Sequence, residues 1–430
     1  MKKRLERLVK LSRMTAGVAG DYIGWRVKDS LFQNISSSEL LKKTHERVGE
    51  RLAATLGDLK GPLMKIGQMA SISSGLLPLE ISESLQVLRK NATFVDYDVI
   101  ARQIERELGE PPERLFTSFS RAPFAAASIG QVHRAVTDDG REVVVKVQYP
   151  GIDESVDADL AHLRLALKAA GVMHGKKEVF RRFFADISGQ LKEELDYCNE
   201  ADNLRYLASF HNAHHPFVRI PEVVGERSSA RVLTLTCEEG DTLEDAAKYP
   251  IETKNLLGER LVTLLYGEII LLGALHGDPN PANLAFRPDG TIVLYDFGCV
   301  KRYTAEEHHR LIDIVRAVFD RDFAKIESAL QDLGVRASEG PVIEPEMYGT
   351  LLEMFSPILS SEVPFDFDKG GLRRNLRTLL PAMKKYGKSF NITQSMMIVQ
   401  RVNVGTYGNL RKLGPKIAVR PVVERILAKA

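Results

Sequence analysis

The chain has 430 residues, of which 44% are hydrophobic and 27% are charged, and its formal net charge is +2. These values are ordinary for a soluble globular protein, and the length exceeds one compact core, so two or three packed units are expected. The small net charge excludes a global electrostatic case for nucleic-acid binding, and no such partner is expected. The three cysteines, Cys198, Cys237 and Cys299, match no zinc-ligand spacing, which favours a reducing compartment.

The first residues, MKKRLERLVKLSRM, are basic and carry apolar side chains at helical spacing. We expect a helix that packs on the domain, and two other interpretations stay open: a membrane-surface helix and a mitochondrial presequence. Helical structure is expected to about residue 60, with an N-cap among serines 36–38. A further helix, GPLMKIGQMASISSGLLP, is bounded by Pro62 and by the break at 75–78, and another covers 96–108 before Pro111 and Pro112.

A strand-rich block follows. Two β-branched runs flank the turn TDDG at 137–140, which is a strong hairpin pattern. Two helices at about 153–171 and 177–209, and two more strands near 217–224 and 231–236, would complete a small sheet with inserted helices. The sequence therefore places most of its strands in the middle of the chain.

From Glu238 onward the pattern is mostly helical, interrupted by one β-rich island whose second strand is TIVLYDFG. The apolar run at 261–275 is short and carries Glu268, so we expect a buried core helix rather than a membrane span. Strands first and helices last, with polar motifs at the join, predict an α+β fold with two lobes. Glu238, at this join, is counted among the candidate nucleotide contacts.

The strongest motif is HGDPNPAN at 276–283, followed by Asp296-Phe297-Gly298. Phosphoryl transfer requires metal ions on the phosphates and an aligned acceptor, and little covalent help from the protein. Asp278 can align the acceptor, while Asn283 and Asp296 supply the oxygen ligands that Mg²⁺ prefers. A surface turn next to an unrelated strand end is the alternative, but a chance match to both halves is improbable.

Lys146 lies in VVVKV, an apolar strand where a lysine is costly unless it is paired or lies in a cleft. In kinase folds such a lysine contacts the α- and β-phosphates and pairs with a helix glutamate. On a single helix, Glu193, Asp196 and Glu200 would share one face, so Glu200 is a candidate partner. The alternatives are an edge-strand lysine that faces solvent and a solvated acidic helix face.

Protein kinases cover the phosphates with a glycine-rich loop, but the corresponding hairpin here contains Ala125, Ala126, Ala127 and Ser128. Alanine carries a Cβ, so its backbone cannot approach a phosphate as glycine can. These four residues are candidate nucleotide contacts, and the grip on the phosphates is expected to differ from that of ordinary kinases.

Together these motifs resemble the UbiB-type (AarF/ADCK) atypical kinases. The resemblance rests on AAASIGQVHRA, KIGQ at 65–68, ELD at 194–196, HGDPNPAN and DFG, and it covers roughly residues 55–330. It implies a bilobal protein-kinase-like fold with an N-terminal helical extension over the active site. It also implies ATP or ADP binding with Mg²⁺, ATPase activity, and support of ubiquinone or other isoprenoid-lipid metabolism at a membrane.

The same resemblance assigns roles to residues. Lys65 and Gln68 are implied to be catalytic residues that face the acidic pair Glu194 and Asp196. Lys146 is implied to pair with Glu200, and metal binding falls to Asn283 and Asp296. On the sequence, Lys65 and Gln68 share one helical face and need partners if they are buried, although Lys65 could instead extend to solvent. We expect Lys65 and the alanine-rich loop to restrain phosphate geometry jointly.

The expected division is an N-terminal helical extension at 1–60, a KxGQ helical segment at 61–110, a kinase-like N-lobe with inserted helices at 111–237 and a helical C-lobe at 238–430. Partners are expected to be a nucleotide, an isoprenoid or quinone-precursor lipid, a membrane surface and lipid-biosynthesis proteins. The expected location is the cytoplasm, with peripheral membrane association as an option, or the mitochondrion in a eukaryotic source.

Two departures from ordinary kinases make protein phosphorylation in trans doubtful: Gly277 replaces the usual arginine, and no APE motif follows DFG at normal distance. Two other functions stay open. A small-molecule kinase of the aminoglycoside or choline type shares HGD-x₄-N but would lack KIGQ and AAAS. A non-catalytic nucleotide- and lipid-binding module would not need Asp278.

A histidine cluster precedes Pro216. The spacing of His211, His214 and His215 could bind a metal, but the sequence shows no carboxylate or cysteine beside them. We therefore expect solvated loop histidines at a helix end.

Overall fold

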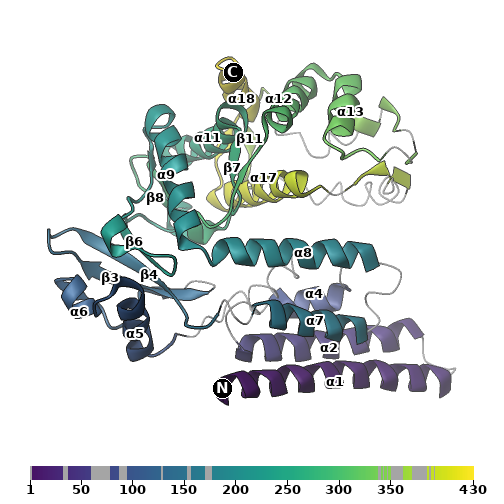
Figure 1. The fold of residues 1–430 in the computed structure, drawn as a ribbon. Helices are drawn as coiled ribbons and strands as arrows, with labels where there is room; N and C mark the ends of the chain where they lie inside the picture. Colours follow the sequence, from purple (N-terminus) through teal and green to yellow (C-terminus); the bar gives the residue numbers. More distant parts are fainter. Residues whose placement is uncertain are drawn as a thin grey trace. The chain divides into compact units, whose positions relative to one another are not determined.

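The computed structural model describes residues 2–31, 37–59, 78–86, 94–126, 129–152, 156–169, 177–337, 340–341, 343–345, 347–349, 362–369, 385–386, 389–391 and 393–430. The chain divides into two compact units (Figure 1). Unit 1 consists of Met1–Asn199 and Val223–Cys237, and unit 2 consists of Glu200–Glu222 and Glu238–Ala430. The division runs through the first turn of one helix, α9.

Unit 1 begins with helices that pack on one another. Their bounds are α1 Lys2–Leu31, α2 Ser37–Leu59, α4 Leu79–Gln86, α7 Val156–Ala169 and α8 Lys177–Glu194. Leu11, Met14 and Val18 of α1 are buried, at the i, i+3 and i+7 spacing that puts side chains on one helix face, and they meet Leu52 and Leu56 of α2. The N-terminal helix therefore packs on its neighbours, as expected.

Unit 1 also contains the small sheet. Its elements are α5 Tyr97–Leu108, α6 Pro112–Leu115, β1 Ser118–Phe119, β2 Ala125–Ala126, β3 Gly130–Val136, β4 Glu142–Gln148 and β6 Val232–Thr236. The strand order is β1-β3-β4-β6, with β2 also paired to β3. The predicted hairpin is confirmed, because β3 and β4 are antiparallel around a turn in which Gly140 has φ 84°.

The core of this sheet follows from alternation along β4. Val143, Val145 and Val147 are buried and pack against Ile100 and Ile104, the apolar face of α5. Helix α5 ends where Gly109 adopts φ 84° and donates its N–H to the carbonyl of Glu105. The helix predicted at 96–108 is therefore confirmed.

Unit 2 is mostly helical, with short strands between the helices. Its elements are α9 (Tyr197–His214, from Glu200 onward), β5 Val218–Arg219, α10 Leu243–Ala246, α11 Ile251–Gly267, a π-helical turn Glu268–Leu272, β7 Ala274–His276, β8 Leu284–Phe286, β9 Ile292–Leu294, β10 Val300–Arg302, α12 Ala305–Asp320, α13 Phe323–Asp332, β11 Phe365–Asp366, α17 Gln394–Leu413, β12 Lys416–Ile417 and α18 Val419–Leu427. The run at 261–275 is mostly buried, as expected, but it is not one helix: α11 ends at Gly267, a π-helical turn follows, and Ala274 and Leu275 belong to β7. Among the described residues, no helix has the length and apolar character needed to cross a bilayer.

Two predicted elements of the middle block are each divided in the structure. The helix expected at 177–209 is two helices, because the chain leaves helical geometry at Leu195 and Asp196 between α8 and α9. The single strand expected near 217–224 divides: Val218–Arg219 form β5, which pairs in parallel with β9 of unit 2, while Val223 makes an isolated antiparallel bridge to Leu235 of β6 in unit 1. Val218 of β5 is buried where β5 pairs with β9 in the three-stranded sheet β5-β9-β8. The local sequence pattern of a short strand does not reveal which sheet the strand joins. The predicted KIGQ helix lies outside the described residues.

Candidate active site

The HGDPNPAN segment connects two strands of unit 2. It begins at His276, the last residue of β7, and ends in a single 3₁₀ turn, Pro281–Asn283, that leads into β8. The Asn280 side chain caps this turn by accepting the N–H of Ala282 at 3.2 Å. Prolines at 279 and 281 restrict the backbone in between, so the loop is locally stiff.

A hairpin brings the second half of the motif next to the first. Strands β8 and β9 are antiparallel with Leu284 opposite Leu294, and the N–H of Tyr295 donates to the carbonyl of Asn283 at 2.9 Å. Asn283 and Asp296 therefore emerge at the same end of one hairpin. Asp296 has φ 58°, a left-handed conformation that is uncommon outside glycine, and its Oδ1 accepts the N–H of Gly298 at 3.2 Å.

The orientation of Asn283 fits a magnesium ligand. Its Nδ2 donates to Oδ2 of Asp278 at 3.0 Å, which leaves Oδ1 as the amide atom available to a cation. Among the residues that the structure describes, no group of three or more His, Cys, Asp or Glu side chains could hold a metal alone. Mg²⁺ in kinases is commonly held by one or two protein oxygens, with phosphates and water completing the octahedron. Asn283 and Asp296 are the residues that would hold it here.

Polar and aromatic contacts tie the loop to the DFG segment. The Nε2 atom of His276 lies 2.8 Å from the carbonyl oxygen of Asp296, and its ring meets that of Phe297 edge-on at 5.4 Å. From α9, Oε1 of Glu200 accepts the N–H of Phe297 at 3.4 Å and Nδ2 of Asn203 donates to the Phe297 carbonyl at 3.2 Å. The helix that carries Glu200 thus holds the DFG backbone.

Lys146 lies in unit 1, at the centre of its sheet. Strand β4 is paired on both sides, with β3 and β6, and Lys146 is only 9% exposed. The alternative of an edge-strand lysine facing solvent is therefore wrong. Its Nζ lies 5.1 Å from the ring centre of Tyr197, the first residue of α9, a cation–π contact. The pairing of Lys146 with Glu200 stays a prediction.

The remaining predicted residues divide into described and undescribed ones. Ala125 and Ala126 form β2, opposite Val132 and Gln131 of β3. In unit 2, Oε2 of Glu238 accepts from Nη2 of Arg287 at 2.7 Å, so this carboxylate has a protein partner. The residues Ala127, Ser128, Lys65 and Gln68 lie outside the described residues.

The acidic pair implied by the resemblance lies at a helix junction. Glu194 is the last residue of α8, and Asp196 caps α9 by accepting the N–H groups of Cys198 at 3.0 Å and Asn199 at 3.3 Å. The prediction that Glu193, Asp196 and Glu200 share one helix face is wrong, because the helix is broken between them. The interaction of this pair with Lys65 and Gln68 stays a prediction.

The prediction for the histidine cluster is wrong for two of its three members. His214 is exposed, but His211 and His215 are buried and hydrogen-bonded to each other. A carboxylate does lie beside them, that of Glu268, far away in sequence. The one local hint was an acid inside the apolar run at 261–275, where an unpaired charge would be costly.

The segment after DFG is short. Residues 299–304 alone separate Gly298 from α12, and Val300–Arg302 form β10, which returns to pair with β7. Thr304 and Glu307 then form a capping box that starts α12 at once. The backbone here leaves little room for the long activation segment on which protein kinases dock peptides.

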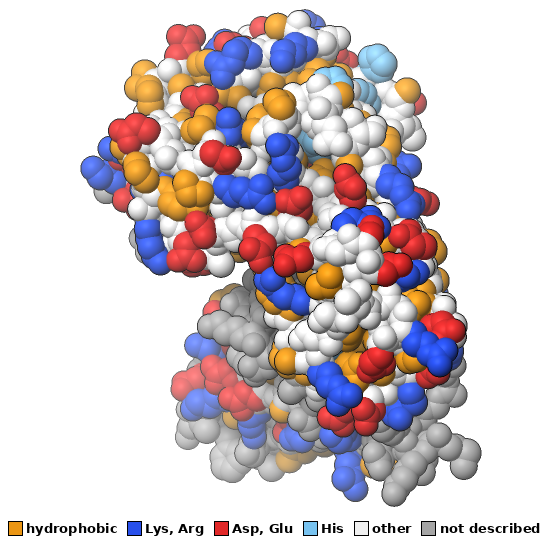
Figure 2. Space-filling model, turned by 90° about the vertical axis from the view of Figure 1, so that its left-hand side faces the viewer, with side chains coloured by type: hydrophobic (Ala, Val, Ile, Leu, Met, Phe, Trp, Pro, Cys, Tyr) orange, Lys and Arg blue, Asp and Glu red, His pale blue; other side chains and the backbone are white. Residues whose placement is uncertain are grey.

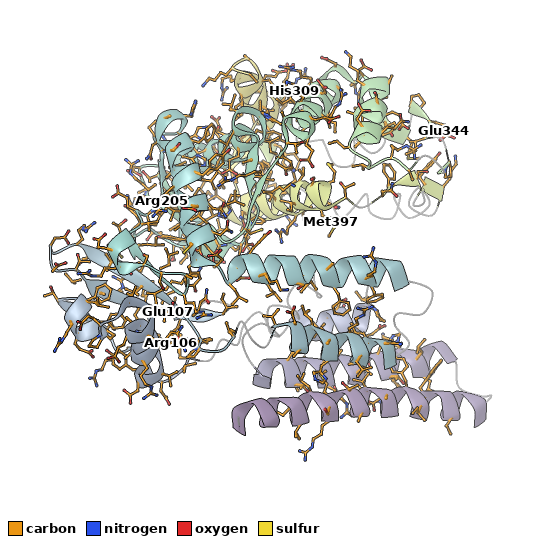
Figure 3. The ribbon with its side chains drawn as sticks, in the orientation of Figure 1. Arg106, Glu107, Arg205, His309, Glu344 and Met397 are labelled. Carbon is orange, nitrogen blue, oxygen red and sulfur yellow. The ribbon has the colours of Figure 1, made fainter. Side chains whose placement is uncertain are left out.

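Charges of both signs are interspersed on the face of the molecule shown in Figure 2. Many of the ion pairs are between exposed side chains, for example Arg205 with Asp202 on α9 at 2.9 Å, where Arg205 is labelled in Figure 3. Exposed pairs of this type contribute little to stability. The mixed surface agrees with the small net charge of the sequence.

A sheet unit with a buried strand lysine, and a helical unit with HGD-x₄-N and DFG on adjoining turns, define an α+β fold of the protein-kinase-like class. Residues 87–330 match the model of the ABC1 atypical kinase-like domain, and the chain belongs to this family, which includes the COQ8 atypical kinases. The UbiB-type resemblance of the sequence is thereby confirmed.

Named relatives cover most of the chain. It is 29% identical over 402 residues to "Atypical kinase coq-8, mitochondrial" of Caenorhabditis elegans, covering 89% of this chain and 52% of that protein. It is 30% identical over 396 residues to "Atypical kinase COQ8B, mitochondrial" of Rattus norvegicus, covering 89% of this chain and 73% of the rat protein. The chain thus spans only about half the length of the nematode relative.

A solved structure shares the fold along nearly the whole chain. The Mycobacterium tuberculosis protein Rv3197, in its complex with erythromycin, aligns with a TM-score of 0.62 at 27% identity. The alignment covers 91% of this chain and 98% of that one. The likeness therefore extends beyond the segment that matches the family model.

Proposed function

We propose that this chain is an atypical kinase or ATPase that binds ATP or ADP with Mg²⁺ and supports ubiquinone or other isoprenoid-lipid metabolism. The observation that carries the proposal is the hydrogen bond from Asn283 to Asp278 at 3.0 Å. It leaves the amide oxygen of Asn283 for a cation at the end of the hairpin that also carries Asp296.

Each site residue has a proposed role in phosphoryl transfer. Asp278 orients the attacking hydroxyl or water and accepts its proton, while Asn283 and Asp296 hold the metal. When bound, Mg²⁺ would neutralise charge on the β- and γ-phosphate oxygens. Lys146 contacts the α- and β-phosphates, and Glu200 keeps Lys146 and the DFG backbone in place, since its carboxylate already accepts the N–H of Phe297.

A small acceptor, or water alone, is favoured over a protein substrate. The short connection at 299–304 supports this. Its residues form β10 and lead directly into the capping box of α12, so the chain has no long segment after DFG on which a peptide could dock. The proposed placement of the KIGQ helix over the site, with Lys65 and Gln68 facing Glu194 and Asp196, acts in the same direction. That part of the proposal rests on the sequence.

The lipid function is proposed from the family. The named COQ8 relatives are mitochondrial atypical kinases, which agrees with a role in quinone metabolism. Proposed partners are an isoprenoid or quinone-precursor lipid, a membrane surface and lipid-biosynthesis proteins. A peripheral location at a membrane follows if these partners are correct.

A small-molecule kinase is the second candidate. The HGD-x₄-N loop favours it, since glycine rather than arginine follows His276. The complex of Rv3197 with erythromycin supplies a concrete acceptor to test. Phosphate transfer to erythromycin or to choline would favour this candidate over an ATPase.

The test is nucleotide turnover by the purified chain. Phosphate release from Mg·ATP would be measured alone, with vesicles that contain an anionic lipid, and with vesicles plus a polyprenyl-quinone-like phenol. We expect turnover that requires Mg²⁺ and rises with vesicles and phenol, and that Asp278→Asn abolishes. Binding of Mg·ADP without any turnover would support the non-catalytic module instead, and absence of binding would refute the proposal.

A further inference from the structure

A buried carboxylate lies directly beside the catalytic loop, outside the set of predicted site residues. Glu268 is the first residue of the π-helical turn after α11 and is 0% exposed. Its Oε2 accepts the N–H of His276 at 2.7 Å, and its Oε1 lies 3.0 Å from Nε2 of His211. One carboxylate thus bonds the first residue of the HGD loop with one oxygen and helix α9 with the other.

The contact with α9 continues into a second imidazole. Nδ1 of His211 lies 2.9 Å from Nδ1 of His215, and these side chains are 0% and 4% exposed. Two facing ring nitrogens make a hydrogen bond only if one carries a proton and the other a lone pair. Burial, together with the neighbouring His211, lowers the pKa of His215 to about 4, so this ring is neutral near pH 7.

The fold makes room for this cluster. A Cβ on Gly267 would lie 2.6 Å from Cε1 of His215, so only glycine allows the ring to approach the helix there. The adjacent residue, Glu268, starts a π-helical turn, a rare geometry that is frequent at functional sites. Gly267 thus leaves space for the ring of His215, and the carboxylate of Glu268 bonds the ring of His211.

The cluster connects α9 to the loop at a second point. Glu200 and Asn203, near the start of α9, hold the backbone of Phe297, whereas His211, two turns later, reaches His276 through Glu268. Figure 3 shows α9, labelled at Arg205, with the side chains of unit 2 gathered beside it. The helix that carries Glu200 therefore contacts both halves of the catalytic motif within unit 2.

A small pocket borders this side of the loop. Glu268, His276 and Asp278 line a cavity of about 40 Å³, which leucines of α11, Leu261 and Leu265, also border. Space of this size admits about one or two water molecules.

We propose that Glu268, His211 and His215 are positioning residues for the catalytic loop: they fix His276, and through it Asp278, relative to helix α9. The test of this proposal by nucleotide turnover rests on the proposed function, but its test by amide hydrogen exchange does not. A merely structural role, in which the cluster only adds to the stability of unit 2, is the competing explanation.

Amide hydrogen exchange of the free protein separates the two explanations. In Glu268→Leu the N–H of His276 loses its acceptor, and a lost buried hydrogen bond of this kind corresponds to about tenfold or more in exchange rate. We expect that increase in peptides spanning 274–283 and 205–215, with peptides spanning 130–148 of unit 1 unchanged. An equal increase in all peptides would mean global destabilisation and would overturn the proposal.

Matched variants sharpen the test. Glu268→Gln keeps an acceptor for His276 while His211 changes tautomer, so it should restore most of the protection. His211→Phe should raise exchange in the same peptides by a smaller factor, and it carries the test if Glu268→Leu does not fold. His214→Ala, an exposed histidine on the same helix, is the control and should leave exchange at 274–283 unchanged.

Turnover gives the second readout. In Glu268→Leu we expect the kcat for Mg·ATP hydrolysis to fall at least tenfold while the KM changes less than threefold, because the loop is displaced rather than removed. Unchanged exchange at 274–283 together with unchanged kcat would refute the proposal. If the parent shows no turnover, the proposed function fails, and hydrogen exchange alone still decides whether the cluster positions the loop.

Discussion

The strand that carries Lys146 and the loop that carries Asp278 hold their side chains by different means. Lys146 lies on β4, where ladders on both sides and buried valines at alternate positions determine which way each side chain points. Asp278 lies on irregular backbone whose position depends on single hydrogen bonds, such as that from His276 to Glu268. A strand position should therefore tolerate the loss of one contact, whereas the loop should not.

The largest effect is expected at the metal ligand of the loop. Asp296→Asn removes the negative oxygen that would hold Mg²⁺, so magnesium-dependent stabilisation by ADP should be lost. At a ligand concentration of 100 Kd that stabilisation amounts to about 2.7 kcal/mol. A thermal-shift series with and without Mg²⁺ measures it, and Asp202→Asn, at an exposed site on α9, is the control. An unchanged shift would contradict the assignment of Asp296.

The strand lysine gives the next largest effect. We expect Lys146→Glu and Glu200→Lys each to weaken nucleotide binding at least tenfold, which is about 1.4 kcal/mol. If the two side chains pair, the double reversal should recover part of the loss, with a coupling of about 0.5–3 kcal/mol. Titration calorimetry with Mg·ADP measures all four proteins. Strictly additive losses would rule the pair out.

A core substitution in β4 tests the other side of the comparison. Val145→Ala removes two buried methyl groups between the sheet and α5 and should cost about 2 kcal/mol of unfolding free energy. Because the strand ladders keep Lys146 in place, nucleotide affinity should change less than threefold. Urea unfolding and calorimetry on the same protein check both statements. A larger change in affinity would show that the strand is as sensitive as the loop.

The buried histidine gives a pH dependence, which appears only as the solution is made acidic. Burial and, to a smaller extent, the neighbouring His211 lower the pKa of His215 to about 4. His214 and Lys429 also lower this pKa, whereas the nearby Glu268 raises it. Between about pH 6.5 and pH 4 the unfolded chain binds a proton that the folded chain does not, so stability falls as the pH is lowered through this window.

The expected loss is of order 1–3 kcal/mol, and it is complete below about pH 4. Burial also lowers the pKa of His45 and of His133 in unit 1, which gives the same sign. His215→Gln should therefore reduce the slope of stability against pH but not remove it. Urea midpoints at pH 7, 6 and 5 test this, with His309→Gln, at an exposed histidine of α12, as the control. An identical slope in His215→Gln would contradict the assignment.

Prediction from sequence worked where the signal was local. The β3–β4 hairpin follows from β-branched runs around TDDG, and α5 follows from Ile100 and Ile104 with Gly109 at its end. The phosphate-site motif could be read because HGD-x₄-N and DFG each lie on one short segment. It failed at Asp196, where a helix break that caps α9 looked like part of one acidic helix.

Residue types and their local periodicity thus determined, by the sequence alone, the β3–β4 hairpin and β6, the α+β class, the family and the candidate ligands Asn283 and Asp296. The tertiary structure decided which distant groups meet. β5 joins β9 rather than β6, and the histidines expected in solvent are buried because Glu268 supplies a carboxylate beside His211. The physical reason is that turns and periodic faces arise from neighbours in the chain, whereas a buried polar group is stable only beside a partner that folding brings to it.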